Sequence, residues 1–149
     1  MRLTSLTFAC LAAAAAMLGA CGGPTAPEQQ LQAARLKWER TRPAAYTFTI
    51  ARNCFCAPGG GPVIVSVRDG VVESRTYAAN GAAVAPAYAE YFPTIDGLFE
   101  VIEDARQRAD AIDVTYDPAF GFPAVISIDY IRTSADDEIT YRATSFKSR

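Results

Sequence analysis

The fold of this chain is decided by residues 63–77, VIVSVRDGVVESRTY. Every second residue between 63 and 67 is valine, which is the period of a β-strand with one buried face. Asp69-Gly70 favours a two-residue type I′ turn, in which both central residues have positive φ. Because so short a connection joins only antiparallel strands, residues 63–77 are predicted to form a β-hairpin.

Upstream of the hairpin, the sequence predicts a helix and a further strand. The helical pattern begins at Pro27, ends before Pro43 and carries an apolar stripe, Leu31, Ala34 and Trp38. Residues 46–51 then alternate aromatic or branched apolar side chains with threonine and alanine, which indicates a strand with one buried face.

Downstream of the hairpin, residues 78–93 are predicted to form a long loop that carries Tyr88, Tyr91 and Phe92. Thr94 is then a suitable N-cap for a second helix, and Asp96 complements the helix dipole. The apolar stripe of this helix has a period of 3.6 residues: Ile95, Leu98, Phe99, Ile102, Ala105 and Ala109. Three more strands are predicted at residues 112–116, 123–131 and 138–146.

The order of elements is therefore helix, three strands, helix, three strands. Short connections between consecutive strands require antiparallel pairing, and amphipathic helices must cover an apolar sheet face. We expect an α+β two-layer sandwich, with about six antiparallel strands and both helices on one face. Residues 28–149 are expected to form this single domain.

The first 27 residues have the layout of an export signal. Arg2 is the only charge before Glu28, and an apolar run ends in Leu18-Gly19-Ala20-Cys21, which resembles the bacterial lipobox. This resemblance implies a signal peptide at residues 1–20, a lipid on Cys21 and a flexible tether at residues 21–27. The alternative is that residues 3–20 remain in the bilayer as a transmembrane helix. Both interpretations place the domain outside the cytoplasm. For the lipid-anchored form, analogy with bacterial lipoproteins favours the outer membrane, with the domain facing the periplasm.

Composition excludes several classes of function. The chain of 149 residues contains no histidine, which removes Ser-His-Asp triads, Cys-His pairs and His-ligated zinc. Its net charge is −2 and its basic residues are scattered, so no nucleic-acid footprint is present. We expect no cofactor and no catalytic residue.

A set of short motifs makes the chain recognisable. In order, they are Trp38, Tyr46-Thr47-Phe48, Cys54-Phe55-Cys56, the hairpin around Asp69-Gly70, Thr94-Ile95-Asp96, Leu98-Phe99, Tyr116-Asp117, Gly121-Phe122-Pro123, Asp129 and Asp136-Asp137-Glu138. Together they resemble a family of small bacterial lipoproteins classed as a domain of unknown function. The resemblance implies a compact envelope domain without an established activity, and it supplies no catalytic residue.

Cys54 and Cys56 are the only cysteines expected in the mature domain. On a regular strand their Cα atoms would lie about 6.6 Å apart with parallel Cβ bonds, so a disulfide requires a bend. In an oxidising compartment a structural disulfide is the first interpretation. A reducible bridge that exchanges thiols, a Cu(I) site and pairing between molecules are the alternatives.

Two further groups of residues have a structural and a functional interpretation. The acidic run Asp136-Asp137-Glu138, with Asp129 or Asp117, is a candidate site for a hard cation, but acids before a strand more often form a turn. Five loop aromatics form either an exposed patch or the ends of the core, and the core is favoured: Tyr88, Tyr91, Phe92, Phe120 and Phe122.

These observations favour a lipid-anchored, non-enzymatic envelope module that acts by binding or by structural interaction. Its expected partners are the membrane, through the lipid, and an unknown envelope protein or small ligand. The rival class is a thiol-redox or copper-handling lipoprotein that uses Cys54 and Cys56. A third class is a ligand carrier, with a pocket between sheet and helices.

Overall fold

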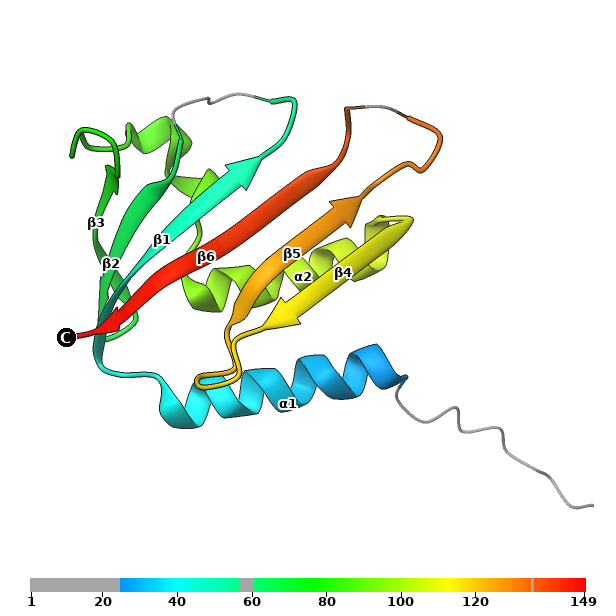
Figure 1. The fold of residues 1–149 in the computed structure, drawn as a ribbon, viewed down its shortest axis with the longest axis horizontal. Helices are drawn as coiled ribbons and strands as arrows, with labels where there is room; N and C mark the ends of the chain where they lie inside the picture. Colours follow the sequence, from blue (N-terminus) through cyan, green and yellow to red (C-terminus); the bar gives the residue numbers. More distant parts are fainter. Residues whose placement is uncertain (1–24, 57–60, 135) are drawn as a thin grey trace, which may run out of the picture.

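The computed structural model describes residues 25–56, 61–134 and 136–149, and it confirms the predicted order of elements (Figure 1). In chain order they are α1 (Ala26–Thr41), β1 (Ala45–Asn53), β2 (Val63–Arg68), β3 (Val71–Tyr77), the short 3₁₀ helix η1 (Pro86–Tyr91), α2 (Ile95–Arg108), β4 (Ala111–Tyr116), β5 (Pro123–Asp129) and β6 (Ile139–Ser148). No helix within these ranges is long and apolar enough to cross a membrane.

The six strands form one antiparallel sheet in the order β3-β2-β1-β6-β5-β4. The first and last strands of the chain, β1 and β6, therefore pair at the centre of the sheet, and β3 and β4 lie at its edges. The predicted hairpin is present, with φ of 49° at Asp69 and 78° at Gly70. These two positive values are what a type I′ turn requires.

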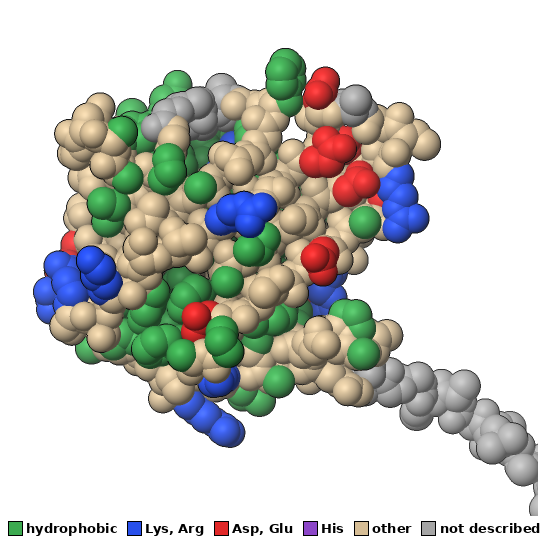
Figure 2. Space-filling view, in the orientation of Figure 1, with side chains coloured by type: hydrophobic (Ala, Val, Ile, Leu, Met, Phe, Trp, Pro, Cys, Tyr) green, Lys and Arg blue, Asp and Glu red, His purple; other side chains and the backbone are tan. Residues whose placement is uncertain are grey.

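The helices lie on one side of the sheet, so the expected two-layer α+β architecture is confirmed. In Figure 1, α2 crosses behind the sheet and α1 runs along its lower end. Alternate residues of β1 and β2 are buried against them, and Trp38 of α1 is fully buried. The opposite face is open, and Figure 2 shows it as mostly uncharged polar side chains and backbone, with scattered hydrophobic side chains.

An irregularity in β6 brings one more aromatic ring into the core. Ser145 has φ of 51°, and the register between β1 and β6 shifts between Thr47 and Thr49. This is a β-bulge, which reverses the side on which the following residues lie. Phe146 thereby reaches the covered face, where its ring lies 5.8 Å from Trp38 and 5.5 Å from Tyr46.

Some predicted boundaries were wrong. Residues 78–93 are not an open loop throughout, because they contain η1 and an isolated bridge between Thr76 and Ala83. β5 ends at Asp129 rather than at residue 131, since a turn follows in which the Ser134 amide donates to the Ile131 carbonyl. β6 runs on to Ser148.

Candidate binding site

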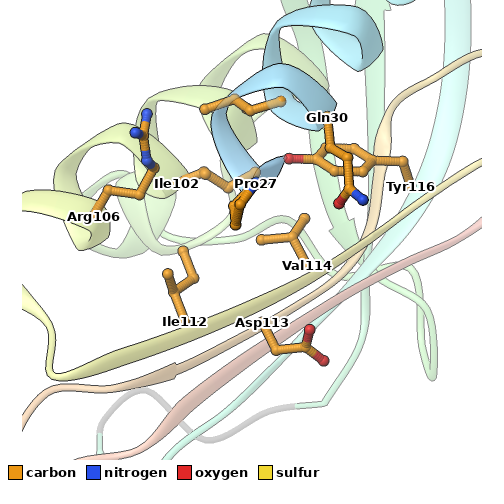
Figure 3. Close-up of a pocket in the computed structure, with 9 residues that line it drawn as sticks. Pro27, Gln30, Ile102, Arg106, Ile112, Asp113, Val114 and Tyr116 are labelled. Carbon is orange, nitrogen blue, oxygen red and sulfur yellow. The ribbon is translucent and has the colours of Figure 1, made fainter. Parts of the chain in front are cut away.

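A pocket lies where α1, α2 and β4 meet (Figure 3). Its volume is about 220 Å³. Each of the three elements contributes apolar side chains, and the polar residues Gln30, Arg106, Asp113 and Tyr116 complete the lining. The apolar part of the lining consists of Pro27, Leu31, Ile102, Ile112 and Val114. The pocket is thus a small apolar recess with a few polar groups around it, which is the usual composition of a binding site.

Tyr116 and Gln30 have polar groups available for a ligand. In Figure 3 the Tyr116 ring extends across the pocket with its hydroxyl toward Pro27 and Ile102. Neither side chain has a hydrogen-bond partner among the residues that the structure describes. Burial raises the pKa of the Tyr116 hydroxyl, so this group remains a neutral donor at physiological pH.

Arg106 is at the pocket, but its charge is already balanced. One guanidinium nitrogen lies 2.5 Å from Glu28 of α1, and the other lies 3.1 Å from Glu103 of α2. Glu28 also accepts a hydrogen bond of 2.6 Å from the Thr25 backbone, and the contacts with Thr25 and Arg106 lower the pKa of its carboxyl. Because two carboxylates neutralise Arg106, the pocket suits a neutral apolar group better than an anion.

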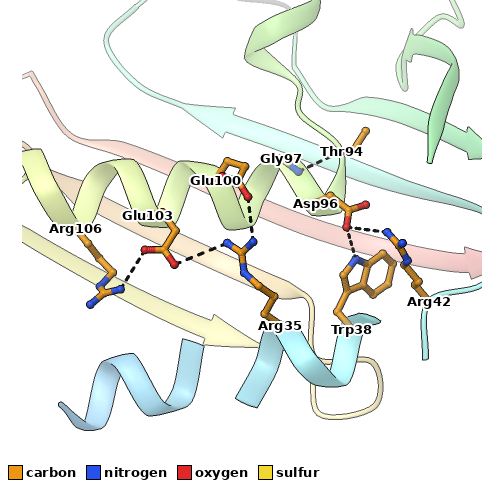
Figure 4. Close-up of polar contacts among 9 residues, drawn as sticks. All are labelled: Arg35, Trp38, Arg42, Thr94, Asp96, Gly97, Glu100, Glu103 and Arg106. Carbon is orange, nitrogen blue, oxygen red and sulfur yellow. Dashed lines mark hydrogen bonds and ion pairs between the residues drawn. The ribbon is translucent and has the colours of Figure 1, made fainter. Parts of the chain in front are cut away.

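Further polar contacts fix the two helical walls of the pocket relative to each other (Figure 4). Arg35 of α1 lies 3.0 Å from Glu100 and 3.8 Å from Glu103 of α2. One carboxylate oxygen of Asp96 accepts hydrogen bonds of 3.1 Å from both the Trp38 indole and the Arg42 guanidinium. The predicted N-cap of α2 is confirmed.

That cap is a hydrogen bond of 3.1 Å from the Gly97 amide to the Thr94 hydroxyl. It satisfies one of the amides that have no partner within the helix. The helix therefore begins where the sequence predicted, next to the Asp96 contacts.

The turn between β4 and β5 packs against the C-terminal half of α1. Asp117 Oδ1 accepts hydrogen bonds from the Ala119 and Phe120 amides, at 2.9 and 2.7 Å. Lys37 and Thr41 of α1 donate to carbonyl oxygens of the same turn. Asp117 thus has a structural role in this turn.

The two edge strands of the sheet, β3 and β4, differ in whether backbone groups outside the sheet pair with them. Residues 78–84 fold back on β3: the Tyr77 amide donates to Ala82, and the Val84 amide donates to Arg75, both at 2.9 Å. In the described part of the chain, no backbone group outside the sheet pairs with β4. The pocket therefore lies beside the uncovered edge.

Cys54 and Cys56 lie at disulfide distance, with their Cα atoms 5.2 Å apart. Residues 54–56 form a bend, which the sequence required for such an approach. The bend follows β1, at the end of the sheet away from α1 (Figure 1). Phe55 between the two cysteines is 83% exposed.

The remaining acidic candidates do not form one site, although Asp129 and Glu138 line the same surface pocket. Asp117 lies at the opposite end of β5 from Asp129 and the acidic run, so these acids do not form one site. Asp136 has φ of 81°, a turn conformation. Within the described ranges, no three His, Cys, Asp or Glu side chains are grouped so that they could hold a metal ion. Cys21, with the predicted signal peptide, lies outside the described residues.

The core interpretation of the loop aromatics is confirmed for all but one. Phe92 and Phe122 are buried, and Tyr91 and Phe120 are partly buried against the core. Tyr88 is exposed. A pocket between sheet and helices was one of the alternatives from the sequence, but its lining residues were not identified, because they come from three elements whose proximity depends on the strand order.

The fold and the pocket define an α+β domain with one open sheet face and one uncovered edge. Residues 30–148 match the model of a family described as a family of unknown function, DUF6174. The chain belongs to this family. No match was found among curated proteins or among solved structures.

Proposed function

We propose that this protein is a non-enzymatic binding module, held at the bacterial cell envelope by a lipid on Cys21. The observation that carries the binding role is the apolar pocket beside the uncovered edge of the sheet. Both helices and the sheet are needed to form it, and ion pairs fix its walls.

The position of α1 supports the anchor. The helix begins at Ala26, five residues after Cys21, and the buried core begins at Leu31. Five residues span at most about 18 Å, so a lipid on Cys21 holds the first turn of α1 close to the membrane surface. Pro27 in this turn lines the pocket, and the Cys54–Cys56 bend lies at the far end of the domain (Figure 1).

Replacing Cys21 by serine tests the anchor. The wild-type protein is expected in the membrane fraction, with a mature mass that shows cleavage before residue 21 and acyl chains on the cysteine. Cys21→Ser should abolish acylation and leave the precursor uncleaved at this position. Cys10→Ser is the matched control, because Cys10 lies within the predicted signal peptide and should change neither mass nor fraction. An unmodified Cys21 in the mature wild-type protein would contradict the anchor.

A redox or copper-handling role is the second candidate, favoured by the exposure of Cys56 and Phe55 at the end of the domain. A structural disulfide predicts no free thiol at these positions in the folded, unreduced protein. It also predicts resistance to glutathione buffers until the domain unfolds. Thiol titration across such buffers is the measurement. Reduction of the folded domain at a cellular glutathione potential would favour thiol exchange, and two free thiols that bind Cu(I) tightly would favour copper handling.

A further inference from the structure

We infer that the β4 edge and the adjoining pocket bind an extended peptide of a partner protein, which adds a seventh strand to the sheet. This inference rests on the proposed binding role and specifies the chemistry of the partner. Peptides bind sheet edges in this way when main-chain groups of the edge are unpaired and a neighbouring pocket receives alternate side chains.

The difference between the two edges is the first step of the argument. An exposed edge strand is a template for further pairing, and proteins usually cover it. Here the chain pairs the last three residues of β3, 75–77, with its own residues 82–84. Among the described residues, β4 pairs on one side only, with β5. Figure 2 shows the surface hollowed between this edge of the sheet and α1.

The alternation of side chains along β4 is the second step. The side chains of Ile112, Val114 and Tyr116 face the helices in the pocket. Asp113 also borders the pocket, but its side chain points away from the helices (Figure 3) and is exposed, as is that of Thr115. Neighbouring strands lie about 4.8 Å apart, and their facing residues point to the same side of the sheet. A strand added to β4 therefore directs every second side chain into the space between β4 and α1. Its other side chains lie beside Asp113.

Charge decides which side chains fit. The pocket offers apolar groups and an arginine that Glu28 and Glu103 already neutralise, so an apolar side chain is favoured there. Asp113 forms no salt bridge with another described residue. A basic residue directly opposite it on the added strand gains an attractive cross-strand pair. The partner segment is thus extended, with a basic residue between two apolar ones.

A synthetic peptide, acetyl-Ser-Val-Lys-Val-Ser-amide, tests the inference with the full-length protein in detergent micelles. Binding is followed by NMR chemical shifts. Shifts confined to β4 and the pocket lining are expected. Two further peptides each carry one N-methyl group, on the lysine amide or on the amide of the first valine. Only alternate amides of an added strand bond to the edge, so one of these two peptides should lose binding and the other should keep it. Equal binding of both methylated peptides, or shifts elsewhere on the domain, would overturn strand addition.

Exchanging charges tests the register. Asp113→Lys should lower the affinity for the lysine peptide by about five- to thirtyfold. The same substitution should raise the affinity for a peptide with glutamate in place of the lysine. The control is Glu39→Lys on α1, an exposed acid remote from β4, which should change neither affinity. No change with Asp113→Lys would contradict the predicted pairing.

Two further outcomes separate this inference from its alternatives. If the β4 amides become protected with rising protein concentration and the mass doubles without peptide, the occupant is a second copy of this chain and the inference is wrong. The peptide assay does not depend on the lipid. Failure of the Cys21 experiment therefore leaves peptide binding intact, and failure of peptide binding leaves the anchor intact.

Discussion

Trp38→Ala is expected to lower the free energy of unfolding by about 3–5 kcal/mol, the range for removing a fully buried large aromatic side chain. Trp38 is 0% exposed, and its ring makes edge contacts with Tyr46, Phe122 and Phe146. Its indole N–H also donates to Asp96, across the contact between the two helices. Urea denaturation followed by circular dichroism measures the loss.

Two variants make the Trp38 result specific. Leu36→Ala, on the same helix at 51% exposure, should cost less than about 1 kcal/mol. Trp38→Phe retains an aromatic ring but not the N–H, and Asp96 keeps its contact with Arg42, so an intermediate loss is expected. If Trp38→Ala unfolded at the same urea concentration as the wild type, the packing described around this ring would be wrong.

Gly121→Ala is expected to cost about 2–4 kcal/mol. Gly121 has φ of +83°, where a side chain adds about 1–2 kcal/mol of strain. An added Cβ would also lie 2.7 Å from the Ala34 carbonyl oxygen and 2.8 Å from Lys37 Cβ, both in α1. Either the turn or the helix must then move, which adds an overpacking cost. Thermal and urea unfolding both report it.

Gly81→Ala is the matched control for this prediction. Gly81 also has positive φ, +71°, but an added Cβ would meet nothing within 4 Å. Its cost should be strain alone, about 1–2 kcal/mol. The difference between the two variants measures the close approach of the β4–β5 turn to α1. Equal losses at both positions would show that this approach is not tight.

Local patterns were sufficient for most of the elements. The alternation of residues 63–67 and the Asp69-Gly70 turn predicted the hairpin, and Thr94 with the stripe that follows it predicted α2. These signals are local because they arise from the period of one element and the conformation of one turn. Phe146 shows where they fail, since only the bulge at Ser145 brings its ring to the covered face.

In the candidate site, too, the features that depend on neighbouring residues were predicted and those that depend on distant residues were not. The sequence identified Cys54 and Cys56 and the bend that they require, because both depend on neighbouring residues. It grouped Asp117 with the acidic run, although β5 separates them. The lipid on Cys21 stays a prediction. A pocket between sheet and helices was one alternative from the sequence, but its lining could not be predicted, because Leu31, Ile102 and Val114 meet only in the folded chain.

By itself, the sequence determined the α+β class, the order α-βββ-α-βββ and the side chains that most elements bury. The tertiary structure alone decided that β1 pairs with β6, which places β4 at an edge beside α1. Periodicity shows which face of a strand is buried but carries no information about its neighbours. Strand order depends on the packing of side chains far apart in the chain, and the position of β4 at an edge depends on strand order.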